Sequence, residues 1–161
     1  MIWRIKEIAP KDAKERTRLG EAFARQLLAE FSDHPADSFI IARTPKGKPY
    51  AENCPLEFNL SHSGKWLLCA VGEQPLGVDI EEIKPRDLKI AHRICTTKEM
   101  EFLAPDQPDA PLRFLKIWTA KEAYFKAIGT GITDLKSVCY FDLLPRLQQI
   151  ETEEYILSIY Q

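Results

Sequence analysis

Two long segments with helical spacing constrain the fold of this chain more than any other feature of its sequence. Apolar residues recur on one face of residues 12–31, and residues 111–128 form a second helical segment. The ends of the second segment agree with this prediction. Asp109 can cap its start, Pro111 suits its first turn and Gly129 suits a left-handed end. We therefore expect two helices of about five turns each.

Shorter patterns before, between and after these helices predict strands. They cover residues 1–8, 38–42, 66–71, 77–83, 137–142 and 155–160, and a further helix is expected over 88–103. A turn at 72–75 predicts that the strands on either side of it form a hairpin, and residues 58–64 are expected to start apolar and end as a polar turn. Hairpins dominate this pattern, which favours an α+β fold over a doubly wound parallel sheet.

Length, charge and cysteine content limit the classes of protein that fit. A chain of 161 residues suits one domain, and a net charge of −2 gives no overall basic field for nucleic acid or an anionic membrane. The four cysteines match no zinc template, so we expect buried thiols in a reducing compartment. No apolar run approaches the ~20 residues of a membrane span, and the N-terminus lacks a signal-peptide core. A cytoplasmic location is expected.

An acidic pattern follows the predicted turn, where residues 77–81 read Gly-Val-Asp-Ile-Glu. Side chains two apart on a strand share a face, so Val78 and Ile80 are expected to point inward and Asp79 and Glu81 outward together. A divalent cation relieves the repulsion between two such carboxylates, and oxygen-only ligands suit magnesium. The alternative is an ordinary half-buried strand with a hydrated acidic face.

The helix over 111–128 carries a second candidate pair. Residues 118–126 read Trp-Thr-Ala-Lys-Glu-Ala-Tyr-Phe-Lys, which places Glu122 and Lys126 four apart on one helix face. The glutamate could be a third metal ligand, and the lysine could neutralise a phosphate or a developing oxyanion. The alternative is a common surface ion pair.

Two polar segments could bind phosphate. Ser61 and His62 lie in Ser-His-Ser-Gly after an apolar stretch, and Lys48 lies in Gly-Lys-Pro. Each has a structural alternative, as a Ser-rich turn and as a loop lysine. No Walker loop is present. The other histidines, His34 and His92, are taken as structural.

Together and in this order, these segments resemble the Sfp-type 4'-phosphopantetheinyl transferase superfamily. That pattern has G-[IV]-D, about forty residues, then W-[ST]-x-K-E-[AS] with a lysine four positions after the glutamate. Asp79 and Glu122 are 43 positions apart in this chain. The resemblance runs over residues 16–131 and implies a single α+β domain, 1–161, of two pseudo-symmetric halves at about 1–75 and 76–161. Many members are longer, so the C-terminal half is expected to be shortened.

The resemblance also implies roles for individual residues around a magnesium site. Asp79, Glu81 and Glu122 would hold Mg²⁺, or Mn²⁺, with the pyrophosphate of coenzyme A. Lys126 resembles the lysine that contacts the phosphate under attack. Glu99 resembles a glutamate proposed as the base for the carrier serine. Its alternative role is structural, because residues 96–99 read as a capping box.

The remaining implied contacts belong to the nucleotide. Lys48, Ser61 and His62 resemble residues at the 3'-phosphate end of coenzyme A, and Arg16 and Thr17 are expected to add to that site.

The resemblance implies a Mg²⁺-dependent enzyme. It would move the phosphopantetheine of coenzyme A to a serine of an acyl or peptidyl carrier protein and release adenosine 3',5'-bisphosphate. Such carriers serve fatty acid, polyketide or nonribosomal peptide synthesis. A pseudo-dimeric monomer that binds neither nucleic acid nor membrane is expected. Two alternatives stay open: an inactive relative that binds coenzyme A or a carrier protein, and another metal-dependent phosphohydrolase.

Overall fold

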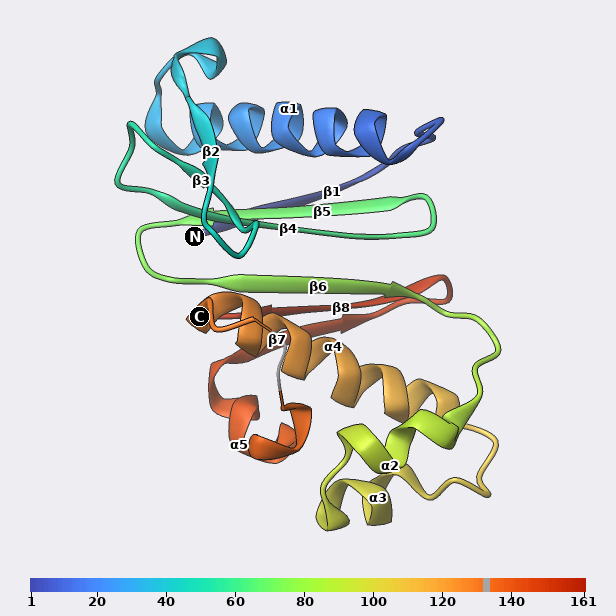
Figure 1. The fold of residues 1–161 in the computed structure, drawn as a ribbon. Helices are drawn as coiled ribbons and strands as arrows, with labels where there is room; N and C mark the ends of the chain where they lie inside the picture. The colour runs from blue at the N-terminus through green and yellow to red at the C-terminus, as the bar shows by residue number, and fades with distance from the viewer. Residues whose placement is uncertain (132–133) are drawn as a thin grey trace.

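The computed structural model describes residues 1–131 and 134–161 (Figure 1). The strands are β1 (Ile2–Glu7), β2 (Ile41–Arg43), β3 (Pro49–Ala51), β4 (Glu57–Ser63), β5 (Trp66–Gly72), β6 (Gly77–Glu82), β7 (Leu147–Glu151) and β8 (Tyr155–Tyr160). The α-helices are α1 (Ala13–Ser32), α2 (Ala91–Ile94), α3 (Thr97–Leu103), α4 (Ala110–Ile128) and α5 (Tyr140–Leu143). Short 3₁₀ turns are η1 (Ala36–Ser38), η2 (Leu88–Ile90), η3 (Leu135–Ser137) and η4 (Leu144–Arg146).

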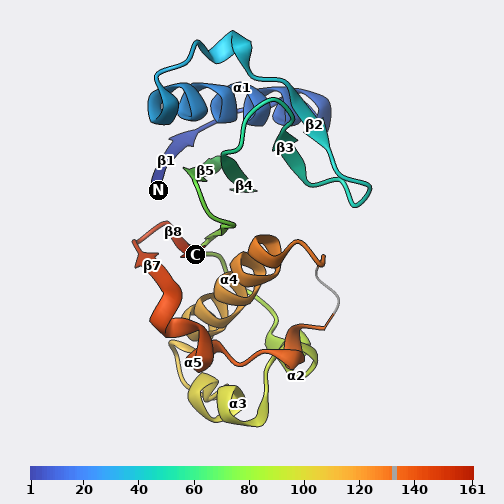
Figure 2. The same ribbon diagram turned by 90° about the vertical axis from the view of Figure 1, so that its left-hand side faces the viewer.

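Two antiparallel sheets form the centre of the molecule. The N-terminal sheet has the strand order β1-β5-β4, and the C-terminal sheet has the order β6-β8-β7. A separate hairpin, β2-β3, lies beside α1. Figures 1 and 2 show four layers: α1, the N-terminal sheet, the C-terminal sheet and α4, with α2, α3 and α5 below α4. The α+β class with two halves is therefore confirmed.

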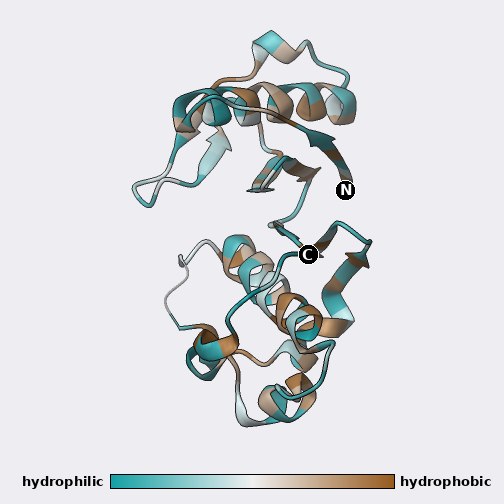
Figure 3. Cartoon of the chain, turned by 90° about the vertical axis from the view of Figure 1, so that its right-hand side faces the viewer, coloured by the Kyte–Doolittle hydropathy of each residue, from teal (hydrophilic) through white to brown (hydrophobic). Residues whose placement is uncertain are grey.

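The alternation of side chains along β5 explains this layering. Leu67, Cys69 and Val71 pack in the cluster under α1, whereas Leu68 and Ala70 pack between the two sheets. Successive residues of a strand point to opposite faces, so one fully apolar strand can serve two cores. The mixed hydropathy along α1 in Figure 3 has the same origin, because only one face of that helix meets the sheet.

The ends of the two long helices follow local sequence signals. Asp12 caps α1 by accepting from the Glu15 amide at 2.7 Å. Gly129 ends α4 with φ of 69°, as expected for a left-handed cap. Asp109 lies at the start of α4 but makes no side-chain cap hydrogen bond there, so that predicted cap is wrong.

Several predicted elements differ from the structure. The expected hairpin of residues 66–71 and 77–83 is wrong, because β5 and β6 belong to different sheets. The turn between them carries the chain from one sheet to the other. Residues 137–142 form a 3₁₀ turn and α5 instead of a strand. The helix over 88–103 is broken at Cys95, where a capping box starts α3.

Gly77 allows α4 to lie directly against β6. A Cβ atom built on this residue would lie 1.9 Å from the Ala123 carbonyl oxygen and 2.4 Å from the Ala127 amide nitrogen. Both obstacles are backbone atoms, which cannot rotate away. The glycine of the acidic pattern therefore fixes the distance between β6 and α4.

We expect Gly77→Ala to lower the free energy of unfolding by at least the ~1–3 kcal/mol typical of overpacked cores. Urea unfolding of the variant measures this loss. Gly20→Ala is the control for overpacking, because a Cβ there meets only Leu60 Cδ1 at 3.5 Å, an ordinary contact, and alanine suits its position in α1. Equal losses in the two variants would contradict the close approach at Gly77.

Candidate functional site

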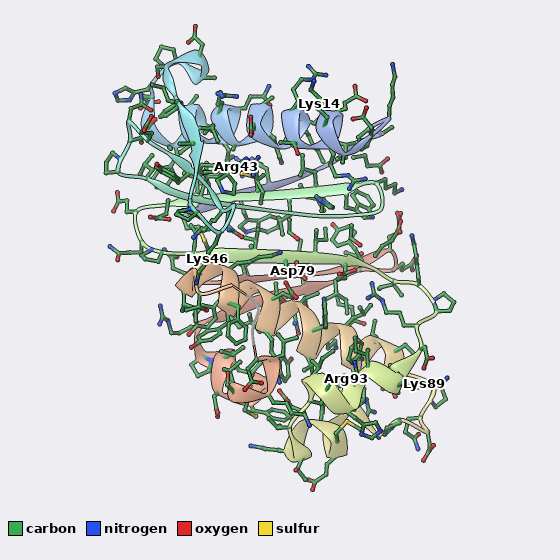
Figure 4. The ribbon with its side chains drawn as sticks, in the orientation of Figure 1. Lys14, Arg43, Lys46, Asp79, Lys89 and Arg93 are labelled. Carbon is green, nitrogen blue, oxygen red and sulfur yellow. The ribbon has the colours of Figure 1, made fainter. Side chains whose placement is uncertain are left out.

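The centre of the candidate site is an ion pair between β6 and α4. Lys126 Nζ lies 2.6 Å from Asp79 Oδ1 and 3.1 Å from Ser61 Oγ, and the Ser61 hydroxyl donates to the same Asp79 oxygen at 2.7 Å. Figure 4 shows Asp79 between β6 and α4, near the level where the two halves meet. Three segments that are far apart in the sequence therefore meet at one carboxylate.

Asp79 was expected to point outward together with Glu81, but it is buried, and the alternative of a hydrated acidic face does not hold for it either. Its side chain is 6% exposed because α4 covers that side of β6. Burial raises the pKa of Asp79, and the Lys126 ammonium and the Ser61 hydroxyl oppose that rise. The second oxygen, Oδ2, is buried without a hydrogen-bond partner among the described residues. A buried carboxylate oxygen without a partner is unusual and indicates a ligand position.

Two further carboxylates lie near Asp79. Glu122 is buried, and burial followed by the negative charges of Asp79 and Glu81 raises the pKa of Glu122 to about 7. Glu81 is half-buried and accepts from Ser63 Oγ at 3.0 Å and from the Arg86 guanidinium. The pKa of Glu122 shows that these negative charges act on one another.

The donor set fits a hard divalent cation, although the side chains are not gathered around one point. Among the described residues, no three His, Cys, Asp or Glu side chains lie together as a metal-holding group. Lys126 and Arg86 instead pair with Asp79 and Glu81. The unpartnered Asp79 Oδ2 and the mutual repulsion at Glu122 are the features that a cation would relieve. The assignment of these three carboxylates to Mg²⁺ therefore stays a prediction.

A cavity of about 250 Å³ opens beside Lys126. It is lined by both halves of the chain: Lys46, Gly47, Lys48, Pro49, Asn59 and Leu60 from the first, and Phe125, Lys126, Gly129 and Gly131 from the second. Lys48 Nζ donates to the Lys126 carbonyl at 3.2 Å, so the loop between β2 and β3 contacts the end of α4. The structure thus brings Lys48 and Lys126 to one cavity.

Arg16 and Lys126 place positive charge near His62. His62 is exposed on β4, and partial burial together with the charges of Arg16 and Lys126 lowers the pKa of its imidazole. Arg16 is half-buried and Thr17 is exposed, one residue further along α1. Arg16 of α1 and Lys126 of α4 therefore lie close enough to His62 to disfavour its charged form, and two cations beside a neutral imidazole suit phosphate oxygens.

Glu99 does not belong to this group. It is fully buried, and its Oε2 accepts from Lys121 Nζ at 2.7 Å and from the Thr96 amide at 2.6 Å. Its Oε1 accepts from the Tyr140 amide at 2.6 Å. The capping box predicted at residues 96–99 is confirmed. The carboxylate that was expected to act as a base has both oxygens occupied inside the core.

Sequence reasoning missed the supporting roles of three residues, and one buried ion pair outside the site. Ser63 and Arg86 hydrogen-bond to Glu81, Gly77 lets α4 pack against β6, and Lys121 pairs with Glu99 inside the core. The alternation Asn-x-Ser-x-Ser over residues 59–63 was an available signal, because it is a strand pattern with polar residues on one face. For Lys121 no local signal exists, since a lysine on a helix is usually exposed.

If coenzyme A is the substrate, as the resemblance implies, His62→Ala should weaken its use by about ten- to a hundred-fold, the scale of one charge-assisted contact. The apparent KM for coenzyme A measures the loss. If His62 contacts the 3'-phosphate, the variant should discriminate less between coenzyme A and dephospho-coenzyme A. His34→Ala is the matched control, since His34 is exposed and bonds to the Ser32 carbonyl. An unchanged ratio between the two substrates in His62→Ala would contradict the assignment.

The fold and site define a two-half α+β protein whose acidic and basic residues meet at the junction of the halves. Comparison with known proteins agrees with this class. The pattern of the 4'-phosphopantetheinyl transferase superfamily matches residues 75–158, and that of the 4'-phosphopantetheinyl transferase N-terminal region matches residues 4–74. The chain belongs to the 4'-phosphopantetheinyl transferase superfamily.

Similar proteins carry the same description. The 4'-phosphopantetheinyl transferase psf-1 of Bacillus pumilus is 40% identical over 120 residues, 73% of this chain and 52% of that protein. The 4'-phosphopantetheinyl transferase gsp of Aneurinibacillus migulanus is 34% identical over 129 residues, 80% of this chain and 54% of that protein. The 4'-phosphopantetheinyl transferase Sfp of Bacillus subtilis (strain 168) is 34% identical over 125 residues, 76% of this chain and 56% of that protein. The chain spans about half the length of these curated relatives.

Within residues 1–131 and 134–161, no helix combines the length and the apolarity that crossing a bilayer requires.

Proposed function

We propose that this chain transfers the 4'-phosphopantetheine of coenzyme A to a serine hydroxyl of an acyl or peptidyl carrier protein. The observation that carries the proposal is the arrangement of Lys126, Asp79 and Ser61 beside a cavity lined by both halves. A lysine next to a buried carboxylate with an open oxygen suits a pyrophosphate accompanied by a cation. Membership of the superfamily supports the same reaction.

The reaction is a displacement at phosphorus. The carrier serine oxygen bonds to the phosphorus that bears the pantetheine arm, and the bond from that phosphorus to the oxygen of the leaving nucleotide breaks. The nucleotide leaves as adenosine 3',5'-bisphosphate with the bonding electron pair. Such transfers depend on positioning and charge neutralisation more than on covalent chemistry by the protein.

We assign the residues of this chain different roles according to where they lie. Lys126 neutralises the phosphate under attack, and Lys48 and His62 orient the nucleotide end, with Arg16 and Thr17 beside them. Ser61, also expected at the nucleotide, is buried, and its hydroxyl bonds to Asp79, the Ile80 amide and Lys126, so it supports Lys126 instead. Glu99 is fully buried with both oxygens hydrogen-bonded, so it does not accept the serine proton, and Glu122 is assigned to the cation. The serine proton passes to solvent water.

Asp79, Glu81 and Glu122 would hold Mg²⁺, or Mn²⁺ in its place. When bound, the cation neutralises charge on the pyrophosphate oxygens and so stabilises the leaving group. Lys126 and Arg86 pair with two of these carboxylates in the structure, so the carboxylates are already oriented by cationic partners.

The proposed protein is a cytoplasmic monomer of two pseudo-symmetric halves, about 1–75 and 76–161. Its partners are coenzyme A and a carrier of fatty acid, polyketide or nonribosomal peptide synthesis, without nucleic acid or membrane. Two alternative functions, a metal-dependent hydrolase and a non-catalytic binder, give different products and are separated by the same experiment.

Release of adenosine 3',5'-bisphosphate from coenzyme A, followed by chromatography, tests the proposal. We expect release only when apo-carrier protein and Mg²⁺ are both present, and none in excess EDTA. Release without a carrier would indicate hydrolysis, and binding of coenzyme A without release would indicate a binder. Full activity in EDTA would contradict the metal assignment, and far-ultraviolet circular dichroism in EDTA shows that the fold is retained.

A further inference from the structure

The two halves meet along β4 and β6, but these strands do not pair through their backbones. Each is an edge strand of its own sheet. Three side-chain oxygens of β4 instead accept backbone N–H groups of β6. The contacts are Val78 N to Asn59 Oδ1 at 3.0 Å, Ile80 N to Ser61 Oγ at 3.3 Å and Glu82 N to Ser63 Oγ at 3.1 Å.

The spacing of these contacts is regular on both strands. Acceptors stand at alternate positions of β4 and donors at alternate positions of β6, so each set lies on one side of its strand. An edge strand covered by another part of the protein has N–H groups without a strand partner, and buried N–H groups need an acceptor. The side chains of residues 59, 61 and 63 supply those acceptors.

The two serines make a second contact each. Ser61 donates to Asp79 Oδ1 at 2.7 Å, and Ser63 donates to Glu81 Oε2 at 3.0 Å. A hydroxyl can accept from one group and donate to another at the same time. Each serine therefore joins a β6 amide to the carboxylate of the residue before it.

We propose that Asn59, Ser61 and Ser63 form a side-chain ladder that joins the two halves, and that Ser63 is a positioning residue for Glu81. The ladder is inferred from the hydrogen bonds alone. The positioning role rests on the proposed function, because it treats Glu81 as a ligand of the divalent cation. Ser61 is part of the ladder too, but its contacts with Asp79 and Lys126 make it unsuitable for a separate test.

The first experiment tests the ladder without any metal. Amide hydrogen exchange is measured by NMR for Val78, Ile80 and Glu82 in the wild type and in Ser63→Ala. We expect the Glu82 amide to lose protection in Ser63→Ala, whereas Val78, which bonds to Asn59, keeps it. Ser63→Thr retains a hydroxyl and suits a strand, so it should restore protection. Unchanged protection at Glu82 in Ser63→Ala would overturn the ladder.

The second experiment tests positioning through the binding of Mn²⁺. Free Mn²⁺ is counted by electron paramagnetic resonance with each variant at one fixed coenzyme A concentration. Loss of a group that orients a metal ligand lowers metal affinity by about 10–100-fold. We expect a loss on this scale in Ser63→Ala, with recovery in Ser63→Thr. Ser32→Ala is the matched control, because it removes a half-buried hydroxyl that bonds to the Leu28 carbonyl in the last turn of α1, in the first half of the chain.

The outcomes separate the ladder from the proposed function. Loss of Glu82 protection with wild-type Mn²⁺ affinity would make Ser63 purely structural and overturn the positioning role. If the wild type itself binds no Mn²⁺, the proposed metal chemistry fails and the positioning role fails with it. In that case, amide exchange at Glu82 still shows whether the side-chain ladder exists.

Discussion

Glu122→Gln should lower the rate of phosphopantetheine transfer by about 10²–10³-fold, the scale on which loss of one charge-stabilising group lowers kcat. Glutamine keeps the volume and the helix propensity of this position in α4, but it lacks the negative charge that a magnesium ligand supplies. Steady-state kinetics at saturating coenzyme A and carrier protein measure the loss. Excess Mg²⁺ should recover only part of the rate.

The same variant should be more stable than the wild type at alkaline pH when no metal is present. The folded protein holds the pKa of Glu122 at about 7, above its ordinary value of 4.5, because burial and two neighbouring carboxylates disfavour its charge. The folded state therefore binds the proton more tightly than the unfolded chain, and stability is lost as pH rises from about 4.5 to 7. Glutamine has no proton to lose, so the variant avoids that decline.

Urea unfolding in EDTA at pH 5 and pH 8 measures this difference. Glu153→Gln, an exposed glutamate in the β7–β8 turn, is the control and should match the wild type at both values. Wild-type turnover in Glu122→Gln would contradict the site, and an identical pH dependence of stability would contradict the burial of Glu122.

Glu99→Gln should lower the free energy of unfolding by about 3–5 kcal/mol, the usual cost of breaking a fully buried ion pair. Lys121 is also fully buried, and its ammonium contacts Glu99 and the carbonyl groups of Ile94 and Leu135, each at 2.7–2.8 Å. Glutamine leaves that ammonium without a counter-charge inside the core. Chemical denaturation of the single variant measures the loss.

A double variant distinguishes this structural role from a catalytic one. Lys121→Met combined with Glu99→Gln removes both charges, so we expect it to recover much of the lost stability. If Glu99 were the base, Glu99→Gln would keep wild-type stability and lose about 10²–10⁴-fold in rate, as removal of a general base does. That result would contradict the burial of the pair.

The sequence predicted the two long helices because their signals are local. Both have an apolar face. The left-handed glycine that ends α4 can be recognised from the residues next to it in the sequence. The capping box at residues 96–99 was also predicted correctly, because it too depends on residues close together in the sequence. Strand β6 was also predicted at its correct place, residues 77–82, within one residue.

Sheet membership was not predictable from local patterns. Residues 66–71 and 77–83 read as a hairpin, because a short turn joins two apolar strands. In the structure β5 pairs with β1 and β4, and β6 pairs with β8, which lies some 80 residues later. Only the packing of two sheets face to face decides between these partners.

The sequence predicted the residues at the centre of the candidate site but not the packing that surrounds them. Asp79, Ser61 and Lys126 were chosen from their patterns, and they meet in one hydrogen-bonded group. The burial of Asp79 was missed, because a strand pattern does not reveal that α4 covers the outer face. Glu99 fits its motif, and its occupied oxygens become visible only when α3, α4 and α5 are packed together.

The mass of an apo-carrier protein after incubation with this chain, coenzyme A and Mg²⁺ tests the central claim most directly. We predict an increase equal to one phosphopantetheine group with the wild type. No increase is expected with Glu122→Gln over the same time, or with a carrier whose acceptor serine is replaced by alanine. An unchanged carrier mass with the folded wild-type chain, across acyl and peptidyl carriers, would contradict the proposed transfer.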